Sequence, residues 1–256
     1  MKIIIKIGTS TLTYVSGCIN IRRIESLCKV ISDLKNAGNE VIMVSSGAIA
    51  MGHGKLNLKN PPQNIAEKQA FAAVGQCELM YAYDKIFSEY NHTVAQILLT
   101  ADDLCNPERH EKFDSTMEQL LEWNVIPIIN ENDTVSTAEI KIGDNDTLAA
   151  IVAESVGADL LVLMTDIDGL FDSDPRKNPK AKFIDRVEEC SDGLMELGGD
   201  AGSERGTGGM YTKLKAAKIA TEAGCDMIIM NGAFPENLYN IIDGKPIGTR
   251  FFAKKG

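Results

Sequence analysis

The sequence predicts an α/β fold with a mostly parallel sheet that helices cover on both faces. Short runs of Val, Ile, Leu and Met alternate with longer amphipathic segments along the 256 residues. These runs are continuously apolar, which is typical of strands buried on both faces. The composition, 44% hydrophobic and 24% charged, is that of an ordinary globular protein. We expect one domain over residues 1–256.

Six apolar runs are expected to form strands, and five amphipathic segments are expected to form helices. The strands are Lys2–Ile7, Glu40–Val44, Thr93–Leu98, Val125–Ile129, Leu160–Met164 and Met227–Met230. The helices are Arg22–Ala37, Ile65–Tyr90, Pro107–Trp123, Asn145–Val156 and Tyr211–Ala223. Gly38 and Gly224 follow two of these helices, where a glycine commonly terminates the helix. Thr134–Lys141 predicts a small hairpin, and Leu170–Gly206 predicts a long loop with short elements.

The composition disfavours several classes of partner. The formal net charge of −10 disfavours binding to nucleic acid and to anionic membranes, so neither is expected. The six cysteines include no Cys-x-x-Cys pair, and three histidines occur, which argues against a zinc site. No apolar run approaches the ~20 residues of a membrane-spanning helix. The N-terminal run is too short for a signal peptide, and we expect a cytoplasmic protein.

Polar residues and glycines follow four of the predicted strands. Lys6-Ile7-Gly8 ends the first strand, Ser45-Ser46-Gly47 follows the second, and Asn130–Asp133 and Thr165-Asp166 follow two others. Ligands bind beyond the carboxyl ends of the strands in open parallel sheets, so we expect one site there. At the end of a buried strand, Lys6 either pairs with an anion or extends into water. The sequence leaves both alternatives open.

Two segments that open helices carry further signals. Residues 206–213 read Gly-Thr-Gly-Gly-Met-Tyr-Thr-Lys, and such glycines let backbone N–H groups approach phosphate oxygens at a helix N-terminus. Lys213 there opposes the helix dipole, so a bound anion explains it better than a flexible surface loop does. Residues 143–147 read Gly-Asp-Asn-Asp-Thr. The three consecutive residues 144–146 are all of types that cap helices, whereas one helix needs only one such residue. Asp146 could therefore hold two lysines while Asn145 contacts a substrate.

These motifs resemble the amino-acid kinase superfamily, and within it the glutamate kinases, from Lys2 to about Phe252. The Gly-Gly-Met loop is shared across the superfamily, whereas Val-Ser-Ser-Gly-Ala together with Asn-Glu-Asn-Asp is specific to the glutamate kinases. The segments that carry the resemblance are Lys6–Ser10, Val44–Ala50, Lys68–Gln76, Gln96–Asp103, Ile126–Ser136, Gly143–Leu148, Thr165–Leu170, Asp174–Arg176 and Gly206–Lys213.

The resemblance implies a three-layer α/β/α sandwich of the carbamate kinase-like type. Roughly residues 1–150 would bind glutamate and roughly residues 151–256 would bind ATP. The implied reaction is phosphorylation of the side-chain carboxylate of L-glutamate by ATP with Mg²⁺, the first step of proline biosynthesis. Feedback inhibition by proline and a homo-oligomer, a dimer or tetramer, are also implied. Many relatives carry a C-terminal PUA module, which we do not expect here because the chain stops soon after Phe251.

The resemblance also implies roles for the residues that match its motifs. Lys6 and Lys213 would stabilise the transferring phosphoryl group, and Asp146 would orient both lysines. Gly8 and Gly47 would supply backbone N–H groups near the phosphates. Glutamate would be bound by Ser46, Asp133 and Asn145. The nucleotide would be held by Lys6, Gly8, Thr165, Asp166, Thr207, Gly208, Gly209, Met210 and Lys213. No protein ligand of Mg²⁺ is identified.

Two alternative functions remain open. One is a related kinase that acts on acetylglutamate, aspartate or a nucleoside monophosphate. The acidic segment Asn130–Asp133 favours a substrate with a free ammonium group over acetylglutamate. The other is a non-catalytic sensor of proline or glutamate, which would not need the lysines of phosphoryl transfer. A side-chain carboxylate is ionised at pH 7 and needs no general base, which fits motifs that contain no histidine.

Overall fold

A mostly parallel sheet forms the centre of the computed structural model, which describes residues 1–136, 144–198 and 209–254. Its strand order is β3-β4-β2-β1-β5-β9-β10-β8, and β10 runs antiparallel to β9. The strands are β1 (Lys2–Ile7), β2 (Glu40–Val44), β3 (Val94–Leu99), β4 (Ile126–Glu131), β5 (Leu160–Thr165), β8 (Arg186–Val187), β9 (Asp226–Asn231) and β10 (Thr249–Phe251). A separate pair is formed by β6 (Leu170–Phe171) and β7 (Phe183–Ile184).

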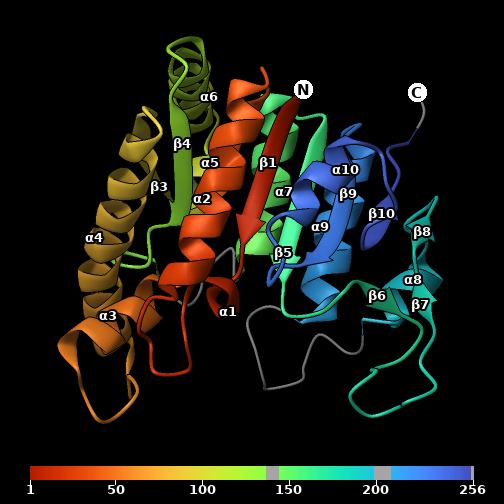
Figure 1. Ribbon diagram of the computed structural model, residues 1–256, viewed down its shortest axis with the longest axis horizontal. Helices are drawn as coiled ribbons and strands as arrows, with labels where there is room; N and C mark the ends of the chain where they lie inside the picture. Colours follow the sequence, from red (N-terminus) through yellow and green to blue (C-terminus); the bar gives the residue numbers. More distant parts are fainter. Residues whose placement is uncertain (137–143, 199–208, 255–256) are drawn as a thin grey trace.

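Helices cover both faces of the sheet, so the three-layer architecture is confirmed (Figure 1). One face carries α2 (Ile21–Asn36), α4 (Ile65–Glu89) and α10 (Asn237–Ile242). The other carries α6 (Pro107–Glu122), α7 (Asn145–Val156) and α9 (Met210–Glu222). Four further helices are α1 (Thr9–Leu12), α3 (Ala48–Leu56), α5 (Ala101–Cys105) and α8 (Asp192–Glu196).

The alternation of side chains along β1 divides the apolar core into two layers. Ile3 and Ile5 pack with α2, α4 and α10, whereas Ile4 packs with α7 and α9. Lys6 lies two residues after Ile4 and therefore faces the same side of the sheet, because side chains i and i+2 share one face of a strand. The strand register thus directs the lysine toward α7 and α9.

The predicted strands and long helices are all present, with ends within two residues of those expected. Gly38 and Gly224 have φ of +89° and +82°, which confirms their positions as helix-terminating glycines. The hairpin expected over Thr134–Lys141 lies largely outside the described residues. The short elements expected in Leu170–Gly206 include β6, β7, β8 and α8. No sequence pattern predicts α1, α5, α10 or β10, because these elements are too short for a periodic pattern.

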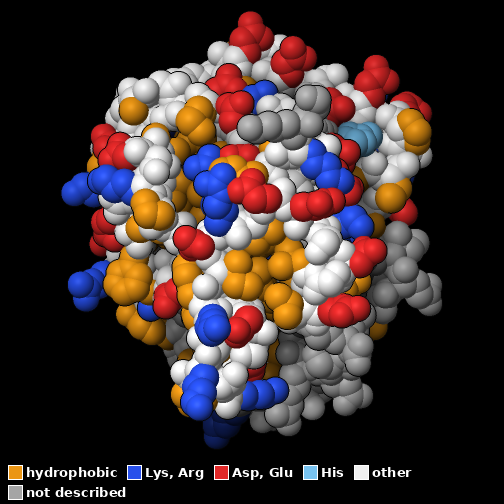
Figure 2. Space-filling view, turned by 90° about the vertical axis from the view of Figure 1, so that its right-hand side faces the viewer, with side chains coloured by type: hydrophobic (Ala, Val, Ile, Leu, Met, Phe, Trp, Pro, Cys, Tyr) orange, Lys and Arg blue, Asp and Glu red, His pale blue; other side chains and the backbone are white. Residues whose placement is uncertain are grey.

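On the side of the molecule shown in Figure 2, acidic and basic side chains are interspersed among apolar ones. Within the described residues, no helix combines the length and the apolar character needed to cross a membrane.

Helices α3 and α4 pack at backbone contact, and this contact fixes one wall of the site. A Cβ atom added at Gly75 would lie 1.7 Å from the carbonyl oxygen of Ala48, and one added at Gly52 would lie 1.9 Å from that of Phe71. Ala48 is the first residue of α3. The close packing therefore positions the segment that connects β2 to α3.

We expect Gly75→Ala to lower the free energy of unfolding by about 1–3 kcal/mol, because the added methyl group forces α3 and α4 apart. Urea denaturation would measure the change. Gly193→Ala in α8 is the matched control, since a Cβ there meets no atom within 4 Å. An unchanged denaturation midpoint in Gly75→Ala would contradict the close packing.

Candidate functional site

A cavity of about 950 Å³ opens at the carboxyl edge of the sheet. Its walls come from the segments that follow β1, β2, β4 and β5 and from the first turns of α7 and α9. The expected gathering of polar residues at this edge is therefore confirmed. The predicted site residues that line the cavity are Lys6, Gly8, Ser46, Gly47, Asp133, Asn145, Asp146, Thr165, Asp166 and Lys213.

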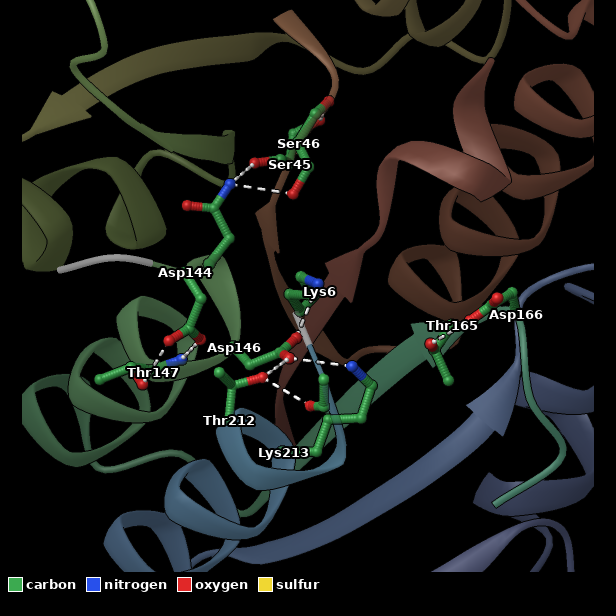
Figure 3. A network of polar contacts seen from close by, with 12 residues as sticks. Lys6, Ser45, Ser46, Asp144, Asp146, Thr147, Thr165, Asp166, Thr212 and Lys213 are labelled. Atoms are coloured by element: carbon green, nitrogen blue, oxygen red, sulfur yellow. Dashed lines mark hydrogen bonds and ion pairs between the residues drawn. The ribbon is translucent and has the colours of Figure 1, made fainter. Parts of the chain in front are cut away.

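Two lysines from distant parts of the chain meet at one carboxylate. The Nζ atom of Lys6 lies 2.6 Å from Oδ1 of Asp146, and that of Lys213 lies 3.1 Å from Oδ2. Figure 3 shows both side chains directed at Asp146. Asp146 is 1% exposed, and both lysines are buried. Of the two alternatives left open for Lys6, the structure shows pairing with an anion, which is the carboxylate of Asp146, and not extension into water.

Local structure explains why these side chains converge. Asp144 caps α7 by accepting a hydrogen bond from the backbone N–H of Thr147, which places Asp146 in the first turn. Lys213 lies near the start of α9, next to Thr212, whose hydroxyl also donates to Oδ2 of Asp146 at 2.9 Å. Helices α7 and α9 pack side by side on the same face of the sheet. The side chains of Asp146, Thr212 and Lys213 are therefore each carried by a helix.

Burial and charge act in opposite directions on the two carboxyl groups at the start of α7. Burial acts to raise the pKa of Asp146, but the ammonium groups of Lys6 and Lys213 outweigh it and lower the pKa below its ordinary value. For Asp144, burial and the neighbouring charge of Asp146 raise the pKa. Asp146 is therefore an anion throughout the neutral range, and it holds both lysines.

On the other side of the cavity, Asn145 connects several polar groups. Its Nδ2 atom donates to the carbonyl oxygen of Ser45 at 2.7 Å, to Oγ of Ser46 at 2.9 Å and to Oδ1 of Asn130 at 3.0 Å. The structure thus brings Ser46 and Asn145 together, and Asp133 lines the same cavity. This side offers hydroxyl, amide and carboxylate groups to a small polar molecule.

The groups expected to hold a nucleotide are described in part. Thr165 is buried, and its hydroxyl donates to Asp166 at 3.2 Å. Asp166 also accepts from Arg176 at 2.7 Å. Gly209 caps α9 and Met210 begins it, although neither is among the residues that line the cavity. Thr207 and Gly208, like Gly143, lie outside the described residues.

The two glycines expected to supply N–H groups differ. The N–H of Gly8 donates to the carbonyl oxygen of Met164 at 3.1 Å, so this group is not available to a phosphate. The expectation for the Gly8 N–H is therefore wrong, because β1 pairs with β5 up to the end of the strand. Gly47 has φ of +94°, a conformation that glycine adopts without strain, and it leads into α3 beside the cavity.

Four residues have contacts at or behind the site that the sequence did not predict: Thr212, Asn130, Arg176 and Gln76. All four lie inside segments that carry the family resemblance. The contacts of Thr212, Asn130 and Arg176 with Asp146, Asn145 and Asp166 become evident in the structure. Gln76 lies in the middle of the long helix α4, where a glutamine gives no local signal of its role. Its amide meets Asn130 only because α4 packs against the end of β4.

We expect Asp146→Asn to lower the free energy of unfolding by about 3–5 kcal/mol at pH 7, because it leaves two buried ammonium groups without their carboxylate. The folded-state pKa of Asp146 lies below the ordinary value of 3.8. The stability that this carboxylate contributes is therefore complete above pH 3.8 and is lost as the pH falls through the lowered pKa. The difference between the wild type and Asp146→Asn should shrink accordingly in denaturation curves.

The matched control is Asp243→Asn, since Asp243 pairs with Lys245 at 3.4 Å and both side chains are about 60% exposed. An exposed pair contributes less than about 1 kcal/mol. A similar loss of stability in both variants would contradict the special position of Asp146.

Comparisons with known proteins agree with this geometry. The model of the amino acid kinase family matches residues 1–231. The chain is 54% identical to a glutamate 5-kinase of Clostridium perfringens, over 100% of this chain and 96% of that protein. It is 52% identical to a glutamate 5-kinase of a Thermoanaerobacter species, over 100% of this chain and 68% of that protein.

Solved structures at lower identity share the fold. A carbamate kinase from Giardia lamblia bound to AMP-PNP matches with a TM-score of 0.69 and 17% identity, over 99% of this chain and 98% of that one. An isopentenyl phosphate kinase of T. acidophilum matches with a TM-score of 0.67 and 19% identity, over 98% of this chain and 100% of that one. The family model, the full-length similarity and the shared fold lead to one conclusion: the chain belongs to the amino acid kinase family.

Proposed function

We propose that the protein transfers the γ-phosphoryl group of ATP to the side-chain carboxylate of L-glutamate, as the first step of proline biosynthesis. The observation that carries this proposal is the convergence of two buried lysines on Asp146 at the wall of the cavity. The names of the relatives, glutamate 5-kinases at about half identity over the whole chain, support glutamate as the acceptor.

The proposed mechanism relies on positioning and charge. A transferring phosphoryl group spreads negative charge over three equatorial oxygens, between the attacking and leaving oxygens. Lys6 and Lys213 stabilise this charge, and Asp146 keeps their ammonium groups at fixed positions. The attacking carboxylate is ionised at neutral pH, so the reaction needs no general base. Two ammonium groups and an orienting carboxylate therefore supply the side-chain charges that we propose for the transfer step.

The acceptor is proposed to bind in the part of the cavity formed by residues 1–150, and the nucleotide in the part formed by residues 151–256. Ser46, Asp133 and Asn145 bind glutamate, with Asp133 facing its ammonium group and Ser46 facing a carboxylate. Gly47 contributes its backbone N–H near the phosphates. On the nucleotide side, Thr165, Asp166 and Lys213 line the cavity, and we propose that Thr207, Gly208, Gly209 and Met210 also hold the nucleotide.

Magnesium fits this site as an ion carried with the nucleotide. The described residues hold no cluster of three or more His, Cys, Asp or Glu side chains that could enclose a metal. Mg²⁺ usually keeps several waters and uses phosphate oxygens with one or two carboxylates. Asp144 lines the cavity next to Asp146, and it is the carboxylate that we propose for this ion. When bound, the ion would neutralise charge on the phosphates.

The resemblance to glutamate kinases supports three further proposals. Proline acts as a feedback inhibitor, the protein forms a homo-oligomer, a dimer or tetramer, and it works in the cytoplasm. A nucleic-acid partner and a membrane partner are not proposed, given the acidic charge of the chain.

Replacing either lysine should lower kcat without loss of the fold. We expect Lys6→Ala and Lys213→Ala each to lower kcat by about 10²- to 10³-fold, the effect of losing a preorganised charged donor. Lys215→Ala, on the exposed face of the same helix α9, is the control and should retain normal turnover. ADP release with glutamate and ATP measures all three, and circular dichroism checks the fold. Normal kcat in either of the first two variants would refute the assigned roles.

A hydroxamate trap tests the proposed reaction itself. The protein is incubated with glutamate, Mg²⁺-ATP and hydroxylamine, and we expect γ-glutamyl hydroxamate because an acyl phosphate reacts with this nucleophile. Parallel reactions with acetylglutamate and with aspartate should give much less product. A preference for either of these would indicate a related kinase. Binding of glutamate without ADP release would indicate a sensor.

A further inference from the structure

A chain of three side-chain amides runs from helix α4 to the wall of the cavity. Oε1 of Gln76 accepts a hydrogen bond from Nδ2 of Asn130 at 2.9 Å, and Oδ1 of Asn130 accepts from Nδ2 of Asn145 at 3.0 Å. Gln76 and Asn130 are 8% and 2% exposed. Asn130 and Asn145 line the cavity, whereas Gln76 lies behind them. We call these three side chains the amide relay.

Backbone groups fix the direction of the amide relay at two points. The N–H of Glu131 donates to Oδ1 of Asn130 at 2.9 Å, so the oxygen of Asn130 must face Glu131 and its NH₂ group must face Gln76. The carbonyl oxygen of Ser45 accepts from Nδ2 of Asn145 at 2.7 Å. Because a backbone N–H can only donate and a carbonyl can only accept, neither asparagine can turn its amide over without losing a bond.

The consequence is that Asn145 directs its NH₂ group toward the protein. Within the described residues, no donor forms a hydrogen bond with its Oδ1 atom, while Nδ2 has three acceptors. Asn145 thus offers an acceptor to a molecule in the cavity. At neutral pH both carboxylates of glutamate are acceptors, and its ammonium group is its donor. The oxygen of Asn145 therefore suits the ammonium group of an amino acid.

Gln76 stabilises this arrangement from behind. Without its Oε1 atom, the buried NH₂ group of Asn130 would lose a hydrogen-bond partner, and a buried unpaired donor is unfavourable. Asn130 would then rotate toward another acceptor and weaken its contact with Asn145. Gln76 belongs to α4, which close packing against α3 holds in place, so the relay rests on a rigid element.

We propose that Gln76 and Asn130 are positioning residues that keep the oxygen of Asn145 directed into the cavity, and that the amide relay thereby selects acceptors carrying a free ammonium group. This inference rests on the proposed function, because it names how that site recognises the substrate. The proposal assigns neither residue a contact with the phosphoryl group. Their replacement should therefore affect recognition of the ammonium group and leave the use of ATP unchanged.

The test compares glutamate with glutarate, which has both carboxylates but no ammonium group. For Gln76→Met, which removes the acceptor but keeps the side-chain volume, we expect the KM for glutamate to rise about fivefold or more, the factor typical of one disturbed hydrogen bond. The ratio of kcat/KM for glutamate over glutarate should fall by a similar factor. The KM for ATP should stay unchanged. Gln76→Glu keeps an acceptor oxygen and should restore the ratio toward the wild-type value.

Tyr83→Phe is the matched control. It removes a buried hydrogen bond between the same helix and the side chain of Ser45, Tyr83 Oη to Ser45 Oγ at 3.0 Å. The carbonyl oxygen of Ser45 and the three amides of the relay keep their hydrogen-bonding groups. Thermal denaturation of all variants shows whether stability is lost, and we expect Tyr83→Phe to keep the wild-type ratio of kcat/KM values. If Gln76→Met does not fold, Asn130→Ser interrupts the relay at its next member and must lower the ratio in the same way.

The outcomes separate this inference from the proposed function. A wild-type protein that does not turn over glutamate refutes both. Normal turnover with an unchanged glutamate-to-glutarate ratio in Gln76→Met, or in Asn130→Ser where the former is unfolded, refutes the role of the relay alone. An equal loss of kcat/KM for glutamate and for glutarate would show a merely structural effect, and so would the same fall in the ratio for Tyr83→Phe. Either result would also refute the role of the relay.

Discussion

The contact of two buried ammonium groups with the carboxylate of Asp146 is the constraint on which the site depends. A charge removed from water is strongly unfavourable unless it is paired. Lys6, Asp146 and Lys213 come from β1, α7 and α9, so this requirement ties a central strand to two helices. Packing of α7 and α9 on one face of the sheet is thus coupled to the positions of the charges. The stability of this part of the fold and the proposed chemistry have the same physical origin.

The two sides of the cavity orient their groups in different ways. Around Asp146 the arrangement is electrostatic, and long flexible lysine side chains are fixed by a carboxylate whose pKa they lower. Around Asn145 the arrangement consists of neutral hydrogen bonds that begin at Gln76 and are fixed in direction by the backbone of Ser45 and Glu131. Charge suits the transfer of a phosphoryl group, whereas directional hydrogen bonds between side-chain amides suit the recognition of one particular substrate. Adjacent residues, Asn145 and Asp146, connect the two sides at the first turn of α7.

Several features of the site could be predicted from sequence because the physics behind them is local or periodic. The runs Lys2–Ile7 and Glu40–Val44 are mostly apolar, and they form strands with those same ends. Parallel strands place their carboxyl ends at one edge, so Lys6, Ser46 and Thr165 could be assigned to a common site before their positions were known. The N–H of Gly8 could not be assigned in this way. Whether it faces the cavity depends on the pairing of β1 with β5, which brings Met164 opposite.

The sequence by itself determined the alternation of strands and helices, the edge at which the site lies, and the motifs that resemble amino-acid kinases. The period of the hydrophobic residues and the helix-terminating residues are properties of neighbouring positions, so they can be identified from the sequence. The tertiary structure alone decided which groups touch: that Lys6 and Lys213 share Asp146, that Thr212 joins them, and that Gln76 supports Asn130. These contacts join residues 54 to 140 positions apart in the chain. Contacts over such separations depend on the packing of layers rather than on local preference.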